Sequence, residues 1–223
     1  MPFATRLTAA FLIALAAPAS AQAPGSSLQG DLQLLQRADA SRSVGGDSAA
    51  VTVIEFFDPS CSTCRDFHLQ RGDSLKALAG PDVRVEYRTY LIPRLVRGWH
   101  GAEAAACAAG LGGPEAFAAM NDRLMEVWDA WREAAVPAEL FTAWAGSLGL
   151  DGDRFADCLA RDVPASLLVA DVLLAGNFAV RGTPTFVFIP RGASSPDDVE
   201  SFYGNQPMQR FEEALAAARS RVR

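Results

Sequence analysis

The fold of this chain is decided by the stretch Val51-Thr52-Val53-Ile54-Glu55-Phe56-Phe57-Asp58-Pro59-Ser60-Cys61-Ser62-Thr63-Cys64. Its first half is β-branched and aromatic and nearly continuous in apolarity, a pattern typical of a buried strand. Asp58 and Pro59 end that strand, and a helical pattern begins at Cys61. Two cysteines separated by two residues are therefore expected between a buried strand and the start of a helix.

This position gives the cysteine pair a chemical role. The N–H groups of a helical first turn, together with the helix dipole, favour a thiolate at Cys61. Cys64 is near enough to attack a mixed disulfide on Cys61, so we expect an exposed nucleophile at Cys61 and a buried resolving thiol at Cys64. A structural disulfide is the alternative. A zinc site is disfavoured because Cys107 and Cys158 lie about 50 residues apart, and we expect neither a metal nor a cofactor.

The pattern on either side of this stretch indicates a sheet that is interrupted by helices. The helix that starts at Cys61 is expected to extend to about Ala79, and residues 83–91 alternate as a second strand. Residues 99–178 show alanine-rich helical runs with no strand pattern, and we expect four or five helices there. Strand patterns return at 185–189 and 199–203, and a last helix is expected at 208–219. This order predicts an α/β domain at 49–97 and 177–223, split by an all-helical insertion at 98–176.

The N-terminal segment has the pattern of a targeting signal. Residues 1–21 combine Arg6, an apolar run and the small-residue site Ala19-Ser20-Ala21, which is typical of a bacterial secretory signal peptide. The apolar run is too short to cross a bilayer as a helix. Residues 22–48 are small and polar apart from a short amphipathic piece at 28–37, and we interpret them as an N-terminal tethering arm. The expected location is therefore periplasmic or otherwise extracytoplasmic, where thiols are oxidised.

Composition narrows the class of protein. Half of the 223 residues are hydrophobic and 21% are charged, which excludes wholesale disorder. The formal net charge is −6, whereas nucleic-acid-binding proteins usually carry a basic surface, so we expect no nucleic-acid partner.

Three further residues draw attention. Glu55 is a carboxylate in an apolar strand, which is destabilising unless it is neutral or paired. We interpret it as a buried acid that exchanges protons with Cys64 through water, with an edge-facing Glu–Arg pair as the alternative.

Pro184 follows Thr183 at the entrance of the strand at 185–189, where a proline cannot donate to the sheet.

The two motifs together carry a family resemblance. Residues 55–67 and the segment Arg181-Gly182-Thr183-Pro184-Thr185-Phe186 resemble the DsbA-like thiol:disulfide oxidoreductases, which are thioredoxin folds with a helical insertion. The resemblance covers nearly all of 44–219. It implies that Pro184 is cis and faces the cysteine pair, and that the backbone of Thr183 binds a substrate peptide as an added strand. It also implies that Glu55 occupies the buried acid position of the family.

One departure concerns the dipeptide between the cysteines. Strongly oxidising members carry Pro-His there, whereas this chain has Ser62 and Thr63, which we expect to contact substrate. Without an imidazolium, the pKa of Cys61 is expected below the usual value of about 8.5 but well above about 3.5. A less stabilised thiolate makes the disulfide less oxidising.

The resemblance also implies partners and a second bridge. Some relatives join two helices of the insertion by a structural disulfide, and Cys107 and Cys158 are the candidates here, with two buried free thiols as the alternative. We expect a monomeric dithiol oxidase that acts on unfolded or reduced exported proteins and is reoxidised by a quinone-linked membrane partner resembling DsbB. A disulfide isomerase or reductase, or a non-catalytic chaperone that uses the groove near Pro184, remains open.

The remaining polar and aromatic residues are interpreted as scaffold. His68 follows Cys64 by four residues and is taken as an ordinary surface or capping histidine. Trp128, Trp131 and Trp144 fall in the helical region and are taken as packing residues.

Overall fold

The computed structural model describes residues 27–93, 95 and 97–223. The predicted signal peptide at 1–21 lies outside the described residues. Five strands form one sheet in the order β1-β3-β2-β4-β5. Their bounds are Ser43–Val44 for β1, Val51–Phe57 for β2, Val83–Thr89 for β3, Thr185–Pro190 for β4 and Glu200–Tyr203 for β5. Strands β2 and β3 are parallel and the other neighbouring pairs are antiparallel. Strand β2 is the central strand of the sheet, and the connection that carries the cysteines follows it.

Helices cover both faces of the sheet, as the continuous apolarity of β2 requires. Helices α2 (Ser62–Lys76) and α9 (Met208–Arg219) cover one face, where Val51 and Val53 pack against Phe67 and Phe211. Helix α8 (Ala165–Asn177) covers the other face at Ile54, Phe56 and Val187. Because side chains alternate along a strand, Glu55 and Phe57 belong to the face under α2.

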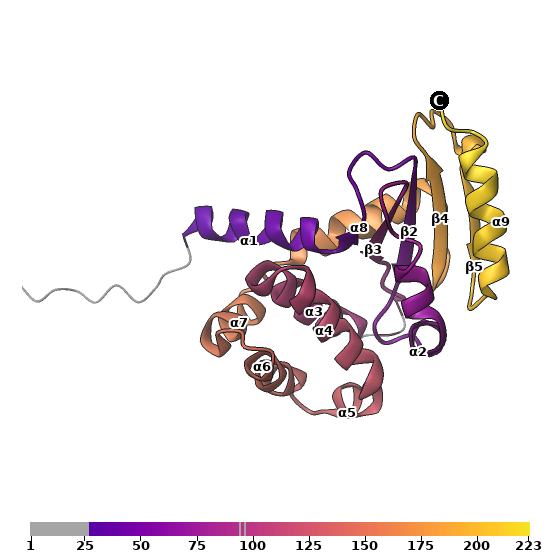
Figure 1. Ribbon diagram of the computed structural model, residues 1–223. Helices are drawn as coiled ribbons and strands as arrows, with labels where there is room; N and C mark the ends of the chain where they lie inside the picture. Colours follow the sequence, from indigo (N-terminus) through magenta and orange to yellow (C-terminus); the bar gives the residue numbers. More distant parts are fainter. Residues whose placement is uncertain (1–26, 94, 96) are drawn as a thin grey trace, which may run out of the picture.

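Residues 98–177, all of them described, form six helices rather than the four or five expected. They are α3 (Gly98–Gly112), α4 (Pro114–Glu126), α5 (Trp128–Glu133), α6 (Pro137–Ser147), α7 (Gly152–Ala160) and α8. The extra element is the six-residue helix α5, which follows α4 after a single residue, Val127. Figure 1 shows α3–α7 gathered on one side of the sheet and α9 on the other.

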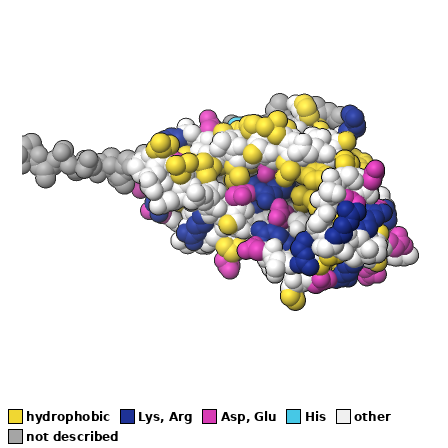
Figure 2. All heavy atoms as spheres, turned by 90° about the horizontal axis from the view of Figure 1, so that it is seen from above, with side chains coloured by type: hydrophobic (Ala, Val, Ile, Leu, Met, Phe, Trp, Pro, Cys, Tyr) yellow, Lys and Arg dark blue, Asp and Glu magenta, His cyan; other side chains and the backbone are white. Residues whose placement is uncertain are grey.

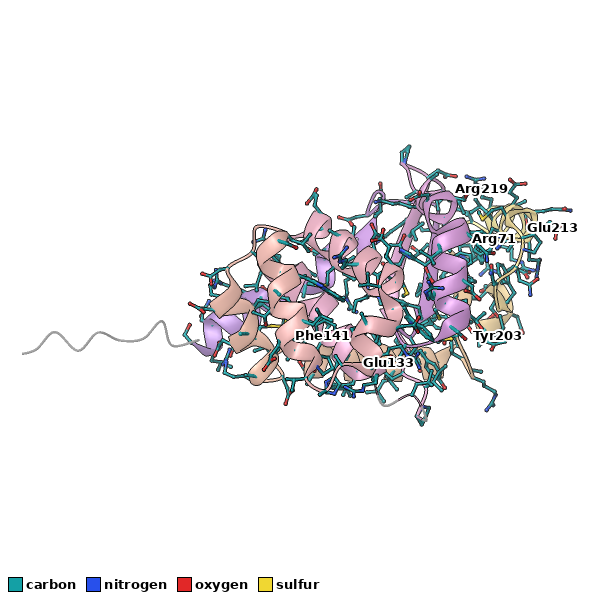
Figure 3. The ribbon with its side chains drawn as sticks, turned by 90° about the horizontal axis from the view of Figure 1, so that it is seen from below. Arg71, Glu133, Phe141, Tyr203, Glu213 and Arg219 are labelled. Atoms are coloured by element: carbon teal, nitrogen blue, oxygen red, sulfur yellow. A yellow bond between two sulfur atoms is a disulfide. The ribbon has the colours of Figure 1, made fainter. Side chains whose placement is uncertain are left out.

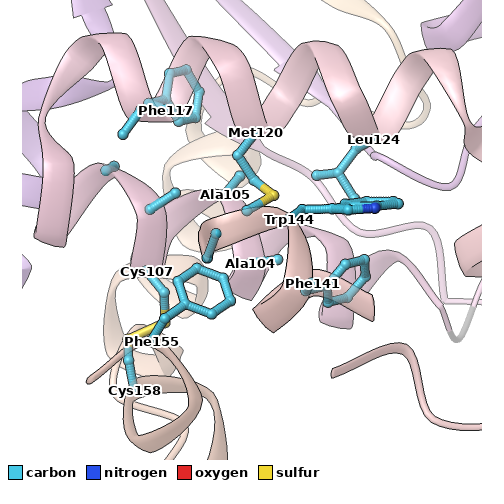
Figure 4. Close-up of a cluster of buried hydrophobic side chains, with 14 of the residues drawn as sticks. Ala104, Ala105, Cys107, Phe117, Met120, Leu124, Phe141, Trp144, Phe155 and Cys158 are labelled. Carbon is cyan, nitrogen blue, oxygen red and sulfur yellow. A yellow bond between two sulfur atoms is a disulfide. The ribbon is translucent and has the colours of Figure 1, made fainter. Parts of the chain in front are cut away.

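A second core holds these helices together. Met120, Leu124, Trp131 and Phe155 are fully or almost fully buried within it. A disulfide joins Cys107 of α3 to Cys158 of α7, and Figure 4 shows the bridge beside Phe155. The bridge therefore staples the first and fifth helices of the run 98–177.

The segment that follows Ser27 is not the tethering arm that its composition indicated. Helix α1 (Leu28–Ser41) has Ser27 as its N-cap and packs on α3, where Gly110 leaves room for Leu34. Directly after α1, Arg42 forms a buried ion pair with Asp171 of α8. Leu34 and Ala38 pack apolarly against the helical core, whereas the buried partner of Arg42 lies 129 residues away, and local sequence gives no signal for such a contact.

The surface carries charges of both signs. On the face shown in Figure 2, acidic and basic side chains are interspersed with hydrophobic ones. A short 3-10 helix at Pro196–Asp198 precedes β5. Within the described part of the chain, no helix combines the length and apolarity that crossing a membrane requires.

Candidate redox site

The cysteine pair lies where the central strand passes into α2. Cys61 is the N-cap residue of that helix, and Cys64 belongs to its first turn. Both carry free thiols. Cys64 is 1% exposed, as expected for a resolving thiol, but Cys61 is only 7% exposed, so the expectation of an openly exposed nucleophile is wrong.

The Thr183 loop covers Cys61. The Thr183–Pro184 peptide bond is cis, and the Cys61 Sγ lies 3.6 Å from the carbonyl oxygen of Thr183. The register of the two strands brings Thr183 close to Cys61, because Thr185 pairs with Phe56 of the strand that leads to the cysteines. Thr183 and Pro184 are themselves buried.

The environment shifts the pKa values of the two thiols in opposite directions. A hydrogen bond from the Cys64 thiol, followed by contacts to Thr183 and the N–H groups of Thr63 and Cys64, lowers the pKa of Cys61 to about 5 despite its burial. Burial raises the pKa of Cys64 well above its usual value. The value for Cys61 falls within the interval expected for a pair without an imidazolium between its cysteines.

Asp58 fixes the loop that precedes the pair. This fully buried carboxylate accepts hydrogen bonds from the N–H of Ser60 at 2.8 Å, from its hydroxyl at 2.7 Å and from the N–H of Ile92 at 2.8 Å. Gly98 lies directly against it, because a Cβ there would be 2.3 Å from Asp58 Oδ1. From the sequence, Asp58 is predicted only to end a strand. An aspartate in a turn does not by itself indicate hydrogen bonds to Ser60 and to the distant Ile92.

The helical insertion also contributes to the site, which the sequence reading missed. Trp128 Nε1 donates to the carbonyl oxygen of Pro59 at 3.0 Å, and Arg65 Nε donates to the carbonyl oxygen of Met125 at 3.0 Å. Met125 also packs with Cys64 and Phe57 in one buried cluster. Trp128 is thus a contact of the active-site loop, whereas Trp131 and Trp144 pack in the helical core.

Glu55 is buried on the sheet face under α2. Its side chain faces His68 rather than an arginine, and burial raises the pKa of Glu55 to about 7 while the charge of His68 opposes that rise. His68 Nε2 lies 2.9 Å from Asp122 Oδ1 of α4. Its interpretation as an ordinary surface histidine is therefore incomplete, since contacts across 54 residues give no signal in local sequence.

A groove adjoins the cis-proline loop. It has a volume of about 470 Å³ and is lined by residues 178–182, by Thr185 and by residues 201–203. Figure 3 shows Tyr203 on the sheet side of the molecule, whereas Phe141 lies among the helices. Ser62 is exposed and Thr63 is half-buried, so both residues between the cysteines are open to a partner to some degree. Among the residues that the structure describes, no three acidic, histidine or cysteine side chains converge as a metal would require.

Comparisons with known proteins agree with this architecture. A family model described as thioredoxin matches residues 37–203. No curated protein matches the chain by sequence. Among solved structures, Wolbachia pipientis alpha-DsbA1 superposes with a TM-score of 0.65 at 18% identity, covering 80% of this chain and 90% of that one.

Two further structures are similar. Pseudomonas aeruginosa DsbA2 has a TM-score of 0.61 at 18% identity and covers 78% of this chain and 92% of its own. A thioredoxin-like oxidoreductase from Silicibacter pomeroyi DSS-3 has a TM-score of 0.61 at 24% identity and covers 84% and 96%. The predicted thioredoxin fold with a helical insertion is therefore confirmed, and the chain belongs to the thioredoxin family with the fold of its DsbA-like members.

Proposed function

We propose that this protein is an exported thiol:disulfide oxidoreductase that oxidises dithiols in substrate proteins. The observation that carries the proposal is the contrast between two neighbouring thiols, one with its pKa lowered to about 5 and one with its pKa raised. A thiolate that is stable at neutral pH is a good leaving group, and it favours the reduced form of the pair. A pair that prefers to be reduced oxidises its partners.

The reaction proceeds in two exchanges. A substrate thiolate attacks the sulfur of Cys61 in the Cys61–Cys64 disulfide, a substrate–Cys61 bond forms, and Cys64 leaves with the electron pair and takes up a proton. A second substrate thiolate then attacks the substrate sulfur of this mixed disulfide, and Cys61 leaves as a thiolate. The substrate has lost two electrons, and the cysteine pair has gained them.

The cis-proline loop supplies a place for the substrate chain. We propose that a peptide binds along Thr183 and Pro184 as an added strand and that side chains beside its cysteine occupy the groove that Tyr203 borders. Ser62 and Thr63 would contact the same peptide from the opposite side. The peptide must displace the contact between the Cys61 thiol and the Thr183 carbonyl, or approach beside it, because Cys61 is only 7% exposed.

The wider setting is part of the same proposal. The secretory pattern at 1–21 supports a periplasmic or similar extracytoplasmic location, where reduced or unfolded exported proteins are the substrates. A quinone-linked membrane partner resembling DsbB would take the two electrons from the reduced pair. The protein would act as a monomer.

The experiment compares the purified protein with its Cys61→Ser variant on a reduced, unfolded substrate that requires a disulfide. We expect the protein to form disulfides in the substrate and the variant to form none. Equal refolding by both would refute the oxidoreductase and favour a chaperone that binds at the groove. An equilibrium titration against glutathione then separates an oxidant from a reductase or isomerase, because it measures how strongly the pair prefers the reduced state.

A further inference from the structure

A second cavity lies behind the cysteine pair, between the sheet and the helical insertion. It has a volume of about 420 Å³, enough for several water molecules. We call it the Glu55 cavity. Its charged and titratable lining comes from four elements: β2 contributes Glu55, β3 contributes Tyr87, α2 contributes His68, Asp73 and Lys76, and α4 contributes Glu115 and Asp122.

The carboxyl group of Glu55 opens into this cavity without a fixed partner. The side chain is buried, and only burial and the charge of His68 shift its pKa, with no contribution from a hydrogen bond. A buried carboxyl group without a protein donor needs water or a proton to satisfy it. The cavity can hold that water, and it leads away from the cysteines toward α4.

His68 occupies the side of the cavity that faces α4. It lies one helical turn beyond Cys64 on α2, with its side chain 21% exposed, and its Nε2 is bound to Asp122. Gly72, one turn further on, lies beside the imidazole ring, and a Cβ there would make an ordinary contact of 3.4 Å with Nδ1. The hydrogen bond to Asp122 of α4 therefore sets the orientation of the ring.

The charges around His68 favour its protonated form. Burial lowers the pKa of His68, but the hydrogen bond to Asp122 and the charges of Glu55, Asp122 and Asp73 outweigh it, so the pKa lies above its usual value. Tyr87, which also faces Glu55, stays protonated because burial raises its pKa. Histidine exchanges protons with water near neutral pH, so His68 is the group on this wall suited to carry a proton in and out.

We propose that His68, oriented by Asp122, acts through Glu55: it returns a proton to the Glu55 carboxylate through water in the Glu55 cavity and recovers one from solvent. The inference rests on the proposed function. It extends the expected role of Glu55 as an acid that exchanges protons with Cys64, because a single buried carboxyl group can donate only once before it must be reprotonated.

The protons balance in both directions. When the Cys61–Cys64 bond is broken by a substrate thiolate, Cys64 leaves with the electron pair and takes the proton of Glu55. The Glu55 carboxylate then takes a proton from the His68 imidazolium through cavity water, and His68 recovers one from solvent. When the pair is reoxidised, Cys64 gives up its proton, and the same steps run in reverse to deliver it to solvent.

The test uses His68→Gln, since glutamine can still donate to Asp122 but does not titrate. The chain has only two histidines, so His100→Gln on α3 is a matched control. Two quantities are measured in the full protein: the pKa of Glu55, from its carboxyl carbon NMR signal, and the rate of disulfide exchange with a dithiol peptide as a function of pH.

Removing the imidazolium takes a favourable positive charge from beside Glu55. We expect the pKa of Glu55 to rise by roughly half a pH unit or more in His68→Gln, and exchange at neutral pH to slow on the order of three- to tenfold. In His68→Ala, added imidazole should restore the rate, because the cavity gives a small base access to the vacated position. His100→Gln should match the parent protein in both measurements.

The outcomes separate this inference from the proposed function. If the parent protein exchanges no disulfides, the proposed function fails. If the parent is active and His68→Gln leaves the pKa of Glu55 and the pH profile unchanged, only the role of His68 is overturned. A His68→Gln variant that is slower by the same factor at every pH, with no imidazole rescue in His68→Ala, overturns it as well, because that is the signature of a structural role.

Discussion

The sulfur of Cys61 lies 3.6 Å from the carbonyl oxygen of Thr183, a residue 122 positions further along the chain. The two residues come from the two halves of the α/β domain, which the helical insertion separates in sequence. Their meeting requires β2 and β4 to be neighbours in the sheet, with Phe56 opposite Thr185. The proposed chemistry of the pair and the proposed binding of substrate thus depend on one register between two strands.

The first prediction concerns the thiolate. Cys64→Ala removes the strongest hydrogen bond to the Cys61 sulfur, so the pKa of Cys61 should rise from about 5. It should remain below the usual value of about 8.5, because Thr183 and the helix N–H groups still contact the sulfur. Ultraviolet absorbance of the thiolate as a function of pH measures both proteins in the reduced state. An unchanged midpoint would show that Cys64 does not stabilise the thiolate.

The second prediction tests the packing of the active-site loop. Gly98→Ala would place a Cβ 2.3 Å from Asp58 Oδ1, and Asp58 cannot move without losing buried hydrogen bonds to Ser60 and Ile92. We expect a loss of about 2 kcal/mol in the free energy of unfolding, and slower disulfide exchange.

Gly146→Ala on α6 is the matched control for this substitution. No atom lies within 4 Å of its added Cβ, and alanine favours a helix by up to about 1 kcal/mol over glycine. Urea unfolding of both variants decides the matter. A Gly98→Ala protein as stable as Gly146→Ala would contradict the close approach.

The third prediction concerns the bridge in the helical region. Cys107 and Cys158 are joined across a sequence separation of 51 residues, and closing a loop of that size stabilises a protein by up to about 4 kcal/mol in the chain-entropy model. The double variant Cys107→Ala/Cys158→Ala should lose about 2–4 kcal/mol of unfolding free energy but keep the pKa of Cys61. Loss of disulfide exchange in a variant that remains folded would place the second pair in the redox reaction.

The fourth prediction concerns pH and stability. The pKa of Glu55 is about 7 in the folded protein and 4.5 as a free side chain, so the folded state binds the proton more tightly. Its stabilising effect is complete below about pH 4.5 and declines as pH rises to about 7, by up to about 3 kcal/mol. Glu55→Gln cannot ionise, so its stability relative to the parent should increase over that range. Chemical unfolding near pH 4 and near pH 8 tests this, and a constant difference between the two proteins would contradict the buried acid.

Much of the fold is readable because its signals are local and periodic. The central strand, its cysteine pair and the last helix can be recognised from local composition. The predicted helix at 208–219 coincides with α9. The helix expected from Cys61 to Ala79 is shorter, ending at Lys76, because helix ends depend on caps that periodicity does not show. The predicted strand at 83–91 likewise ends at Thr89.

The rest depends on contacts between distant residues. The amphipathic pattern at 28–37 gives no sign of the buried ion pair of Arg42 with Asp171, which fixes this segment to α8 across 129 residues. In the same way, the pairing of His68 with Asp122 and the contact of Trp128 with Pro59 join the sheet domain to the helical region. Local pattern identifies such residues only as polar or aromatic, and their roles follow from the tertiary structure.

The most direct test of the central claim is to trap the mixed disulfide. A Cys64→Ser variant has no resolving thiol, so a substrate bound to Cys61 through its sulfur should accumulate as a covalent complex. We predict that mass spectrometry of that complex, formed with an activated disulfide of a cysteine peptide, finds the peptide on Cys61, while Cys107 and Cys158 remain joined. A folded variant that forms no adduct at Cys61 would contradict the account.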